Sequence, residues 1–378
     1  MAALTSAAVI GLSLLGTGTA VAGDHSGSGS GKDPVTIASG LDNPRQLSFT
    51  PSGDLLVAEA GKGGDGPCMA GPEGGTVCFG ASGAVTRINW RGQQDRIITG
   101  LPSIGGQGNG SRAIGPSDVL GVGRIVTVLI GLGANPAVRD SLPAPGQRMG
   151  TLIQTTGDYS RFRTIADLAT WEATNNPVDP DQPPDSDPAG LLYNWGNYVV
   201  ADAGGNTVLN VGPFGRISLL AKFEDRLVDA PPFLGLPPGT QIPMQSVPTS
   251  VATVGFDGSY YISELTGFPF PKGAANIYRL DRWGKVTVFA SGLTNVTDLA
   301  FNGRDLYAVQ ISTEGLLNPP PPKGSVVKVK PGGTTPSDHT PIASDLFAPY
   351  GIAFRGNNAY VTTGAVAAGA GEVIRIRL

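Results

Sequence analysis

One short pattern recurs six times along the chain and constrains the fold more than any other feature. Each copy starts with a strand-like segment, continues through two further strands, and ends on a short apolar segment that closes a fourth strand. Periodic four-strand units of this kind are the signature of a β-propeller. The sequence therefore predicts an all-β fold, a six-bladed β-propeller of four-stranded blades. The closing segments are Ile37–Leu41, Ile98–Leu101, Ile165–Leu168, Leu219–Phe223, Phe289–Leu293 and Ile342–Leu346.

The two ends of the repeat indicate how the ring closes. The segment Val35–Ala38 precedes any first strand, whereas the last copy stops after its third strand, at Leu378. We therefore predict that the N-terminal strand pairs into the last blade and serves as its fourth strand. Such pairing removes an open sheet edge, which otherwise invites association with other chains. The prediction is a single domain over residues 35–378, and we expect a monomer.

The segment before this domain has the composition of an export signal. Residues 1–22 are rich in Leu, Ala, Val and Gly and end in Ala20-Val21-Ala22, which fits the apolar core and cleavage site of a signal peptide. A plain Ala/Gly-rich tail is the alternative. Residues 23–34 follow as a flexible Gly/Ser linker. We expect no transmembrane anchor, and a protein that is secreted or periplasmic.

The two cysteines, Cys68 and Cys78, lie in one long loop among Gly and Pro residues. In an exported chain this spacing predicts a disulfide that closes a small loop. Two free thiols are the alternative. A zinc site is disfavoured, because two thiolates are too few for a closed shell and no histidine lies near them in the sequence.

The connections between strands differ greatly in length. First and second strands, and third and fourth strands, are mostly joined by tight turns, whereas most of the other connections are long. In a propeller the two kinds of long connection emerge on one face, which we call the long-loop face, and the tight turns form the opposite short-turn face. Loops over a rigid scaffold usually hold the binding site, so we expect it on the long-loop face. The long connections are 61–83, 102–115, 131–150, 169–187, 224–247, 265–275 and 312–324.

Charge and histidine content exclude several classes of function. Charged residues make up 15% of the chain, the formal net charge is −4, and Lys and Arg form no cluster. The electrostatic footprint of a nucleic-acid-binding protein is therefore missing, and we expect no nucleic-acid partner. The chain has 2 histidines, His25 in the linker and His339 in a turn of the short-turn face. Catalysis by Ser-His-Asp or Cys-His arrangements and histidine-bound metals are thereby disfavoured.

Polar residues are expected to converge at the mouth of the ring on the long-loop face, where first strands begin and second strands end. Carboxylates that meet on one axis can bind Ca²⁺ through oxygen ligands, or act as general acid and base if burial raises one pKa. The alternative is that they bond turns and backbone N–H groups, as Asp often does. The metal candidates are Glu59, Asp118, Glu264 and Asp298. The candidates for binding a ligand on this face are Arg45, Asp202, Gln310 and Tyr350.

Two stretches resemble a known family. Residues 165–206, with the runs Asp187-Pro188-Ala189-Gly190 and Asp202-Ala203-Gly204-Gly205-Asn206, are similar to the ScyD/ScyE family of exported bacterial proteins, and so are residues 40–45. The resemblance implies a six-bladed propeller like those of NHL-repeat and gluconolactonase-like proteins. It also implies an association with the synthesis of scytonemin, an indole–phenol pigment. The Glu/Asn/Asp metal set of the gluconolactonases has no match in this sequence.

These observations lead to one main hypothesis and two alternatives. The main hypothesis is a secreted, non-catalytic propeller that binds a small molecule, glycan or protein through its long-loop face. The first alternative is a Ca²⁺-dependent hydrolase or lactonase. The second is an accessory protein in the biosynthesis of aromatic secondary metabolites, which rests on the family resemblance alone.

Overall fold

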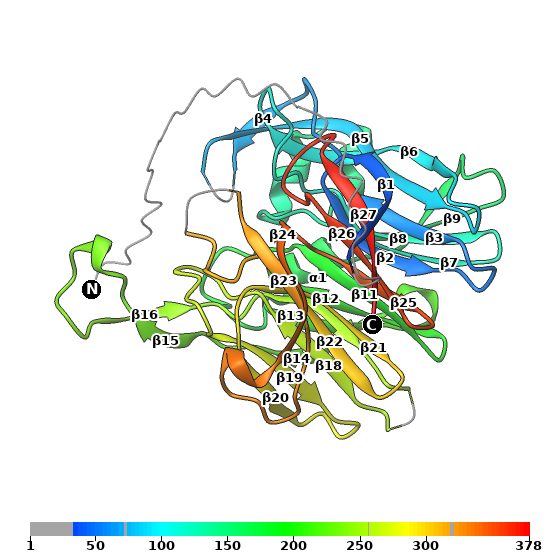
Figure 1. Ribbon diagram of the computed structural model, residues 1–378. Coiled ribbons are helices and arrows are strands. Elements are labelled where there is room, and N and C mark those ends of the chain that lie inside the picture. Colours follow the sequence, from blue (N-terminus) through cyan, green and yellow to red (C-terminus); the bar gives the residue numbers. More distant parts are fainter. Residues whose placement is uncertain (1–32, 72–73, 256, 318–320) are drawn as a thin grey trace.

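The computed structural model describes residues 33–71, 74–255, 257–317 and 321–378 (Figure 1). The predicted signal peptide and residues 23–32 of the predicted linker lie outside these residues. Within them strands dominate, and the one α-helix, α1 (Leu168–Asn175), lies in the long connection 169–187. The prediction of an all-β fold is confirmed.

Antiparallel strands form six sheets and one separate hairpin in the described residues. We number the sheets in chain order and call the first strand of each its inner strand. Sheet 1 contains β2 (Pro44–Phe49), β3 (Leu55–Glu59), β5 (Thr76–Ile88) and β6 (Gln94–Gly106), with β4 (Cys68–Ala70) paired to β5. Sheet 2 contains β7 (Pro116–Val122), β8 (Ile125–Ile130), β9 (Thr151–Thr156) and β10 (Phe162–Asp167). Sheet 3 contains β11 (Pro188–Asn194), β12 (Asn197–Asp202), β13 (Thr207–Val211) and β14 (Ile217–Lys222).

The C-terminal half repeats this arrangement. Sheet 4 contains β17 (Pro248–Ala252), β18 (Tyr260–Glu264), β19 (Ala275–Leu280) and β20 (Val286–Leu293). Sheet 5 contains β21 (Val296–Asn302), β22 (Asp305–Gln310), β23 (Lys323–Lys328) and β24 (Thr340–Phe347). Sheet 6 contains β25 (Ile352–Arg355), β26 (Asn358–Thr363), β27 (Gly371–Arg377) and β1 (Val35–Leu41). The separate hairpin, β15 (Arg226–Asp229) and β16 (Gln241–Met244), projects from the long-loop face (Figure 1).

The inner strands contact one another in a cyclic order. Strand β2 contacts β7, β7 contacts β11, β11 contacts β17, β17 contacts β21, β21 contacts β25, and β25 contacts β2. At the end of the chain, β1 pairs antiparallel with β27, so that Val35 lies opposite Arg375 and Leu41 opposite Gly371. The N-terminal strand therefore completes the sheet of the C-terminal strands, in the place the sequence predicts for it.

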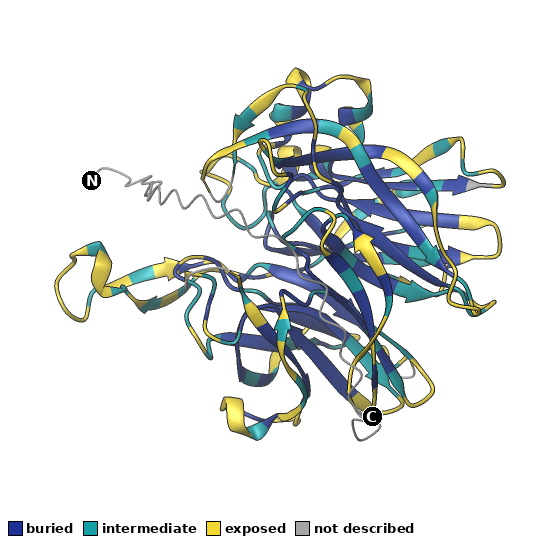
Figure 2. Ribbon diagram, turned by 45° about the horizontal axis from the view of Figure 1, so that its top comes forward, coloured by how far each residue is buried: buried dark blue, intermediate teal, exposed yellow. Residues whose placement is uncertain are grey.

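The core lies between neighbouring sheets, and the second strands are mostly buried, as in β3, β8, β18 and β22 (Figure 2). Successive residues of β8 show this: Val128 packs in a cluster with Val85 of sheet 1, whereas Leu129 packs in a cluster with Leu209 of sheet 3. Side chains alternate between the faces of a strand, so both sets must be apolar when both faces are covered. The runs of consecutive apolar residues in the second strands follow from this burial.

The predicted disulfide is confirmed. Cys68 and Cys78 are bonded to each other, and they lie directly opposite in the short pairing of β4 with β5. The bond fastens the long connection that leads from β3 to β5.

The pairing of β1 with β27 leads to a prediction about stability. Leu41 is fully buried among residues of sheets 1 and 6, whereas Val35 on the same strand is 48% exposed. Replacing Leu41 by Ala leaves a cavity, so we expect Leu41→Ala to lower the free energy of unfolding in urea by about 2–5 kcal/mol. The control Val35→Ala should change it by less than about 0.5 kcal/mol. Equal effects would mean that β1 does not belong to the folded domain.

Candidate functional site

The inner strands begin with a shared local geometry. Near their starts, β2, β7, β11, β17 and β21 each show a shift of register against the second strand, as a β-bulge produces. A bulge re-aims the neighbouring side chains and often lies next to a functional site. The segments that lead into the six inner strands begin at Pro44, Pro116, Pro188, Pro248, Val296 and Pro349, and the third residue of each occupies an equivalent place around the axis of the ring. These third residues are Gln46, Asp118, Gly190, Ser250, Asp298 and Gly351.

Two carboxyl groups line a cavity between the inner strands. The cavity has a volume of about 100 Å³, and Asp118 and Asp298 both line it. Asp118 Oδ2 accepts a hydrogen bond from the Leu191 N–H at 2.7 Å, and Asp298 Oδ2 accepts one from the Ile352 N–H at 2.8 Å. In each case the donor belongs to the next sheet in the ring. The other oxygen of each group accepts a hydrogen bond from the residue that follows it.

Glycines make these contacts between sheets possible. A Cβ atom on Gly190 would lie 2.6 Å from the Cα of Ser250, and one on Gly351 would lie 2.7 Å from the Cα of Gln46. Real Cβ atoms do not approach backbone so closely, so any other residue would push the inner strands apart. The two glycines precede the residues whose N–H groups bind the carboxyls.

Burial changes the ionisation of both carboxyls. It raises the pKa of Asp298 to about 7, whereas the hydrogen bonds from Ser250 and Ile352 lower this pKa. It raises the pKa of Asp118 well above its usual value, and repulsion from Asp298 adds to the effect. Two carboxylates in one small cavity cannot both ionise at low cost. Near neutral pH the pair therefore holds less than two full negative charges.

Gln46 crosses the axis of the ring. Its Nε2 donates a hydrogen bond to the Thr249 carbonyl at 2.9 Å, which joins sheet 1 to sheet 4. In the cyclic order of inner strands these two sheets are three places apart. The side chain of Gln46 therefore joins sheets on opposite sides of the inner strands, and it lines the same cavity as Asp118 and Asp298.

On the long-loop side of Gln46, Arg45 and Tyr350 lie together at the mouth of the channel. The Arg45 guanidinium donates hydrogen bonds to the carbonyls of Ala365 at 2.9 Å and Ala113 at 2.6 Å, and it stacks over the Tyr350 ring at 4.7 Å from the centroid. Burial raises the pKa of Tyr350 to about 12, and Arg45 opposes that rise. Two of the four ligand-binding residues expected from the sequence thus meet in one place.

Asp187 interacts electrostatically with this pair and is hydrogen-bonded to Asp202. Asp187 Oδ1 accepts a hydrogen bond from the Leu132 N–H at 3.0 Å, and the Asp187 N–H donates one to Asp202 Oδ1 at 2.7 Å. Burial and then repulsion from Asp202 raise the pKa of Asp187 to about 7, whereas attraction to Arg45 lowers it. Burial also raises the pKa of Asp202 to about 6. The mouth therefore combines a fixed cation with acids that titrate near neutral pH.

Glu172 of α1 adds a further carboxyl to this group. Its side chain is fully buried, and neither oxygen has a hydrogen-bond partner in the described part of the chain. It presses against Gly205, where a Cβ atom would lie 2.7 Å from Oε2. Burial, with repulsion from Asp202 and Asp185, raises the pKa of Glu172 to about 8. The group is therefore mostly protonated at neutral pH.

The polar residues at the ends of second strands share a structural contact. Each accepts a hydrogen bond from a residue two positions before the inner strand of its own sheet begins. The pairs are Glu59 with the Asp42 N–H, Asp202 with the Ser186 hydroxyl, Glu264 with the Ser246 hydroxyl, and Gln310 with the Thr294 N–H. These side chains fasten the connection that leads into each inner strand, which is the alternative role that the sequence left open for the acids.

The four metal candidates therefore separate into two groups. Asp118 and Asp298 share the axial cavity, whereas Glu59 and Glu264 lie within sheets 1 and 4. Each glutamate has its own arginine, with Glu59 Oε2 at 2.6 Å from Arg96 Nη2 and Glu264 Oε2 at 2.7 Å from Arg226 Nη2. In the described residues, no group of three or more His, Cys, Asp or Glu side chains is arranged to hold a metal ion.

The sequence did not single out Gln46, Glu172 or Asp187. Asp187 could have been found, because it immediately precedes Pro188 at the start of an inner strand. Gln46 occupies the same place in sheet 1 as Asp118 in sheet 2 and Asp298 in sheet 5. An amide at this position does not indicate in the sequence that its side chain bonds to the opposite sheet. Glu172 gives none either, since its burial depends on how α1 docks.

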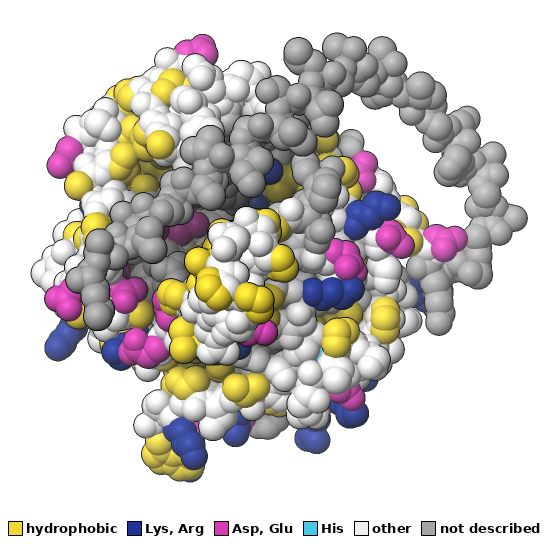
Figure 3. Space-filling view, turned by 90° about the vertical axis from the view of Figure 1, so that its left-hand side faces the viewer, with side chains coloured by type: hydrophobic (Ala, Val, Ile, Leu, Met, Phe, Trp, Pro, Cys, Tyr) yellow, Lys and Arg dark blue, Asp and Glu magenta, His cyan; other side chains and the backbone are white. Residues whose placement is uncertain are grey.

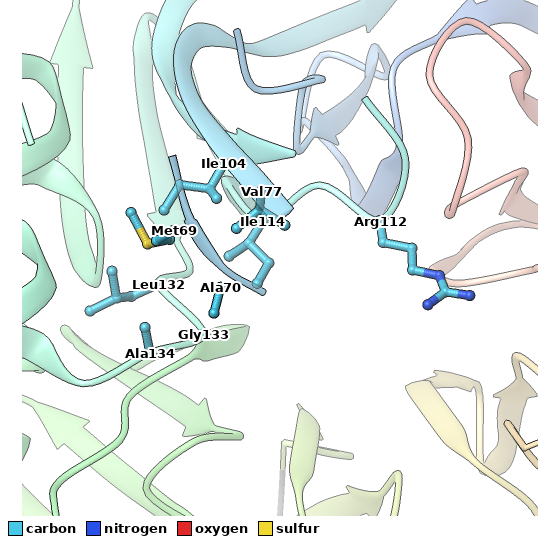
Figure 4. A pocket seen from close by; sticks show the side chains of 9 residues that line it. All are labelled: Met69, Ala70, Val77, Ile104, Arg112, Ile114, Leu132, Gly133 and Ala134. Atoms are coloured by element: carbon cyan, nitrogen blue, oxygen red, sulfur yellow. The ribbon is translucent and has the colours of Figure 1, made fainter. Parts of the chain in front are cut away.

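A second cavity, of about 30 Å³, lies between the long loops of sheets 1 and 2 (Figure 4). Apolar side chains such as Met69, Ile104 and Leu132 line it, and Arg112 points away from them (Figure 4). A space of this size holds about one water molecule, so it is too small for an organic ligand.

Comparisons with known proteins indicate the fold. No family model matches the chain, and no curated protein matches it in sequence. Among solved structures, a gluconolactonase from Xanthomonas campestris has a TM-score of 0.51 at 10% identity, over 91% of this chain and 89% of that one. Virginiamycin B lyase from Staphylococcus aureus gives 0.45 at 12% identity, over 92% and 99%. The PQQ-bound aldose sugar dehydrogenase of Streptomyces coelicolor gives 0.48 at 12%, over 91% and 96%.

The chain has a β-propeller fold. At such low identity the likeness extends to the fold alone, so the ScyD/ScyE resemblance stays a prediction. No helix in the described residues is long and apolar enough to cross a membrane.

The buried Glu172 leads to a prediction about pH. Its pKa is about 8 in the folded chain and 4.5 as an ordinary value, so between these pH values the folded state keeps a proton that the unfolded state releases. Stability should therefore fall as pH rises from about 4.5 to about 8. Glu172→Gln cannot ionise, so we expect a shallower fall and a higher Tm than wild type at alkaline pH.

The matched control is Asp229→Asn, which removes an exposed carboxyl from hairpin β15–β16. Thermal melts of the three proteins across this pH range test the prediction. A pH dependence that is the same in Glu172→Gln and in wild type would contradict it.

Proposed function

We propose that the protein is a secreted six-bladed β-propeller that binds a small carboxylate-bearing molecule at the mouth of its axial channel, without catalysing a reaction on it. The cyclic contacts of the six inner strands and the pairing of β1 with β27 support the ring of six blades. The observation on which the binding proposal rests is the fixed position of Arg45, which stacks over Tyr350 and attracts the carboxyl of Asp187 electrostatically.

Arg45 suits the recognition of an anion because its geometry is fixed before binding. Two backbone carbonyls and the Tyr350 ring hold the guanidinium, so little side-chain entropy remains to be lost. Arginine pairs with carboxylates through two parallel hydrogen bonds when its remaining N–H groups are accessible. Asp187 can bind hydroxyl groups of the same molecule. A sugar acid has both features.

The hydrogen bonds of the other carboxyls favour binding over hydrolysis. Asp118 and Asp298 bind backbone N–H groups of neighbouring sheets, and Glu59 and Glu264 bind arginines and the connections within their own sheets. Groups occupied in this way hold the ring together. They are not arranged as a nucleophile with its base, nor as three ligands around one point.

Calorimetric titration with gluconate and glucuronate, and with glucose as their neutral counterpart, tests the binding proposal. We expect the acids to bind and glucose to bind much more weakly. Because a hydrogen bond to a charged group contributes about 1.5–3 kcal/mol, Arg45→Gln should weaken binding of the acids by roughly 10- to 100-fold. Arg45→Lys should recover only part of this loss.

Arg355→Gln is the matched control. Arg355 also donates to a backbone carbonyl, that of Gly53, and stacks on an aromatic ring, that of Phe49, but it lies on the short-turn face. Its loss should leave binding unchanged. Absence of binding by either acid, or equal affinities of Arg45→Gln and wild type, would contradict the proposal.

A Ca²⁺-dependent lactonase is the second candidate. The paired carboxyls of Asp118 and Asp298 in one cavity favour it, and so does the fold shared with a gluconolactonase. Its metal ligands would have to include groups other than carboxylates, such as the amide of Gln46 and the hydroxyl of Ser250.

Titration with Ca²⁺ and an assay of gluconolactone hydrolysis separate the two candidates. We expect no heat of Ca²⁺ binding and no hydrolysis. Stoichiometric binding that is lost in both Asp118→Asn and Asp298→Asn, but kept in the control Asp281→Asn on the short-turn face, would replace the binding proposal by the lactonase.

A further inference from the structure

Three of the 4 tryptophans are exposed at tight turns. Trp90 between β5 and β6 is 70% exposed, Trp195 between β11 and β12 is 88% exposed, and Trp283 between β19 and β20 is 76% exposed. Phe214, in the turn between β13 and β14, is also exposed. Large aromatic rings are usually mostly buried, so such exposure is informative. All four turns belong to the short-turn face, opposite the channel mouth.

The aromatic turns are spread around the ring. Trp90 belongs to sheet 1, Trp195 and Phe214 to sheet 3, and Trp283 to sheet 4. In the cyclic order of inner strands, sheets 1 and 4 lie three places apart, on opposite sides of the axis. A small ligand cannot reach rings so placed at the same time. A flat and extended surface can contact them together.

The two faces differ in charge. In the tight turns Lys and Arg outnumber Asp, although the whole chain has a net charge of −4. The basic residues there are Arg91, Arg124, Arg161, Arg216, Arg282, Lys285, Arg304 and Lys330, and the acidic ones are Asp54, Asp158, Asp257, Asp281 and Asp338. On the long-loop face the acidic residues outnumber the basic ones, and Figure 3 shows side chains of both kinds on this side of the molecule. In its described long connections the acidic residues are Asp65, Asp140, Glu172, Asp179, Asp181, Asp185, Asp187, Glu224, Asp225, Asp229 and Glu314, and the basic ones are Lys62, Arg112, Arg139, Arg148, Arg226, Lys272 and Lys323.

Cations lie directly on two of the exposed rings. Arg91 stacks over Trp90 at 4.6 Å from the ring centroid, and Arg282 stacks over Trp283 at 4.1 Å. An indole ring with a guanidinium beside it matches the interface of a bilayer with anionic lipids. There aromatic rings favour the headgroup level and basic side chains are attracted by the surface charge. The stacked arginines also cover a face of each ring on which a sugar would otherwise stack.

We propose that the short-turn face docks on a lipid bilayer that contains anionic lipids, with Trp90, Trp195, Phe214 and Trp283 at the level of the headgroups. The opposite charges of the two faces orient the molecule, because the acidic long-loop face is repelled by the same surface. The mouth with Arg45 then points away from the membrane into solution. This docking is independent of what the mouth binds.

Vesicle sedimentation of the full chain tests the proposal. The vesicles are of phosphatidylcholine alone, or of equal parts phosphatidylcholine and phosphatidylglycerol. We expect binding to the mixed vesicles that weakens with added salt, much weaker binding to phosphatidylcholine, and a shift of tryptophan emission to shorter wavelength on binding. Every variant has the same residues 1–22, so differences between variants report on the docking face.

Two pairs of substitutions separate the aromatic from the electrostatic contribution. Trp90→Ser with Trp283→Ser should weaken binding at least about tenfold, because burying an apolar side chain of this size changes affinity by more than that factor. Arg91→Gln with Arg282→Gln should weaken binding by roughly fivefold for each charge, and only on vesicles with phosphatidylglycerol.

The matched control is Phe233→Ser with Leu236→Ser, which removes exposed apolar side chains near hairpin β15–β16 of the long-loop face. It should bind vesicles as wild type does. Thermal melts should be the same for all these proteins, since the replaced side chains are exposed.

The proposal is overturned if the protein binds the two kinds of vesicle equally, if the tryptophan pair can be replaced without loss of vesicle binding, or if the control pair loses binding as well. The proposal would also be overturned if the protein bound a polysaccharide or another protein instead of vesicles, and if that binding depended on the same tryptophans.

Discussion

The close approach of the inner strands around one axis is the constraint on which the rest of the structure depends. Gly190 and Gly351 allow the backbones to approach, and the carboxyls of Asp118 and Asp298 accept N–H groups from the sheets that follow. The donors are the N–H groups of Leu191 and Ile352, which lie near the starts of inner strands, and an unpaired N–H group at the centre of the ring would be costly. Buried acids with raised pKa values are therefore compatible with a structural role at the axis.

Hydrogen bonding to the segments that begin the inner strands also explains why the second strands end in polar residues. Glu59, Asp202, Glu264 and Gln310 each bind the connection that leads into the inner strand of their own sheet. A side-chain bond at this point fixes where the bulged strand begins, and hence which side chain reaches the axis. The residue types differ while the contact persists, since any of them offers an oxygen that accepts a hydrogen bond. An acid at the end of a second strand is therefore evidence of the repeated structural contact rather than of a catalytic or metal-binding role.

The repeat made much of this structure predictable from the sequence. Strand order, the disulfide and the place of β1 all follow from local patterns, and Arg45 and Tyr350 meet because both lie at the starts of inner strands. The state of Glu172 could not be predicted, since it depends on how one short helix docks against the turn at Gly205. The bridge made by Gln46 depends on the distance between sheets 1 and 4, which the packing of all the inner strands sets together. Such features belong to tertiary geometry and leave no local signal.

The two faces of the ring differ for a reason that lies in its topology. Antiparallel strands send every tight turn to one side and every long connection to the other, so each side can acquire its own chemistry while the sheets between them stay the same. Turns such as 89–93 and 281–285 therefore lie on the opposite face from Arg45 and Asp187. The binding mouth and the membrane-docking surface that we propose therefore lie on opposite faces, with the buried sheets between them.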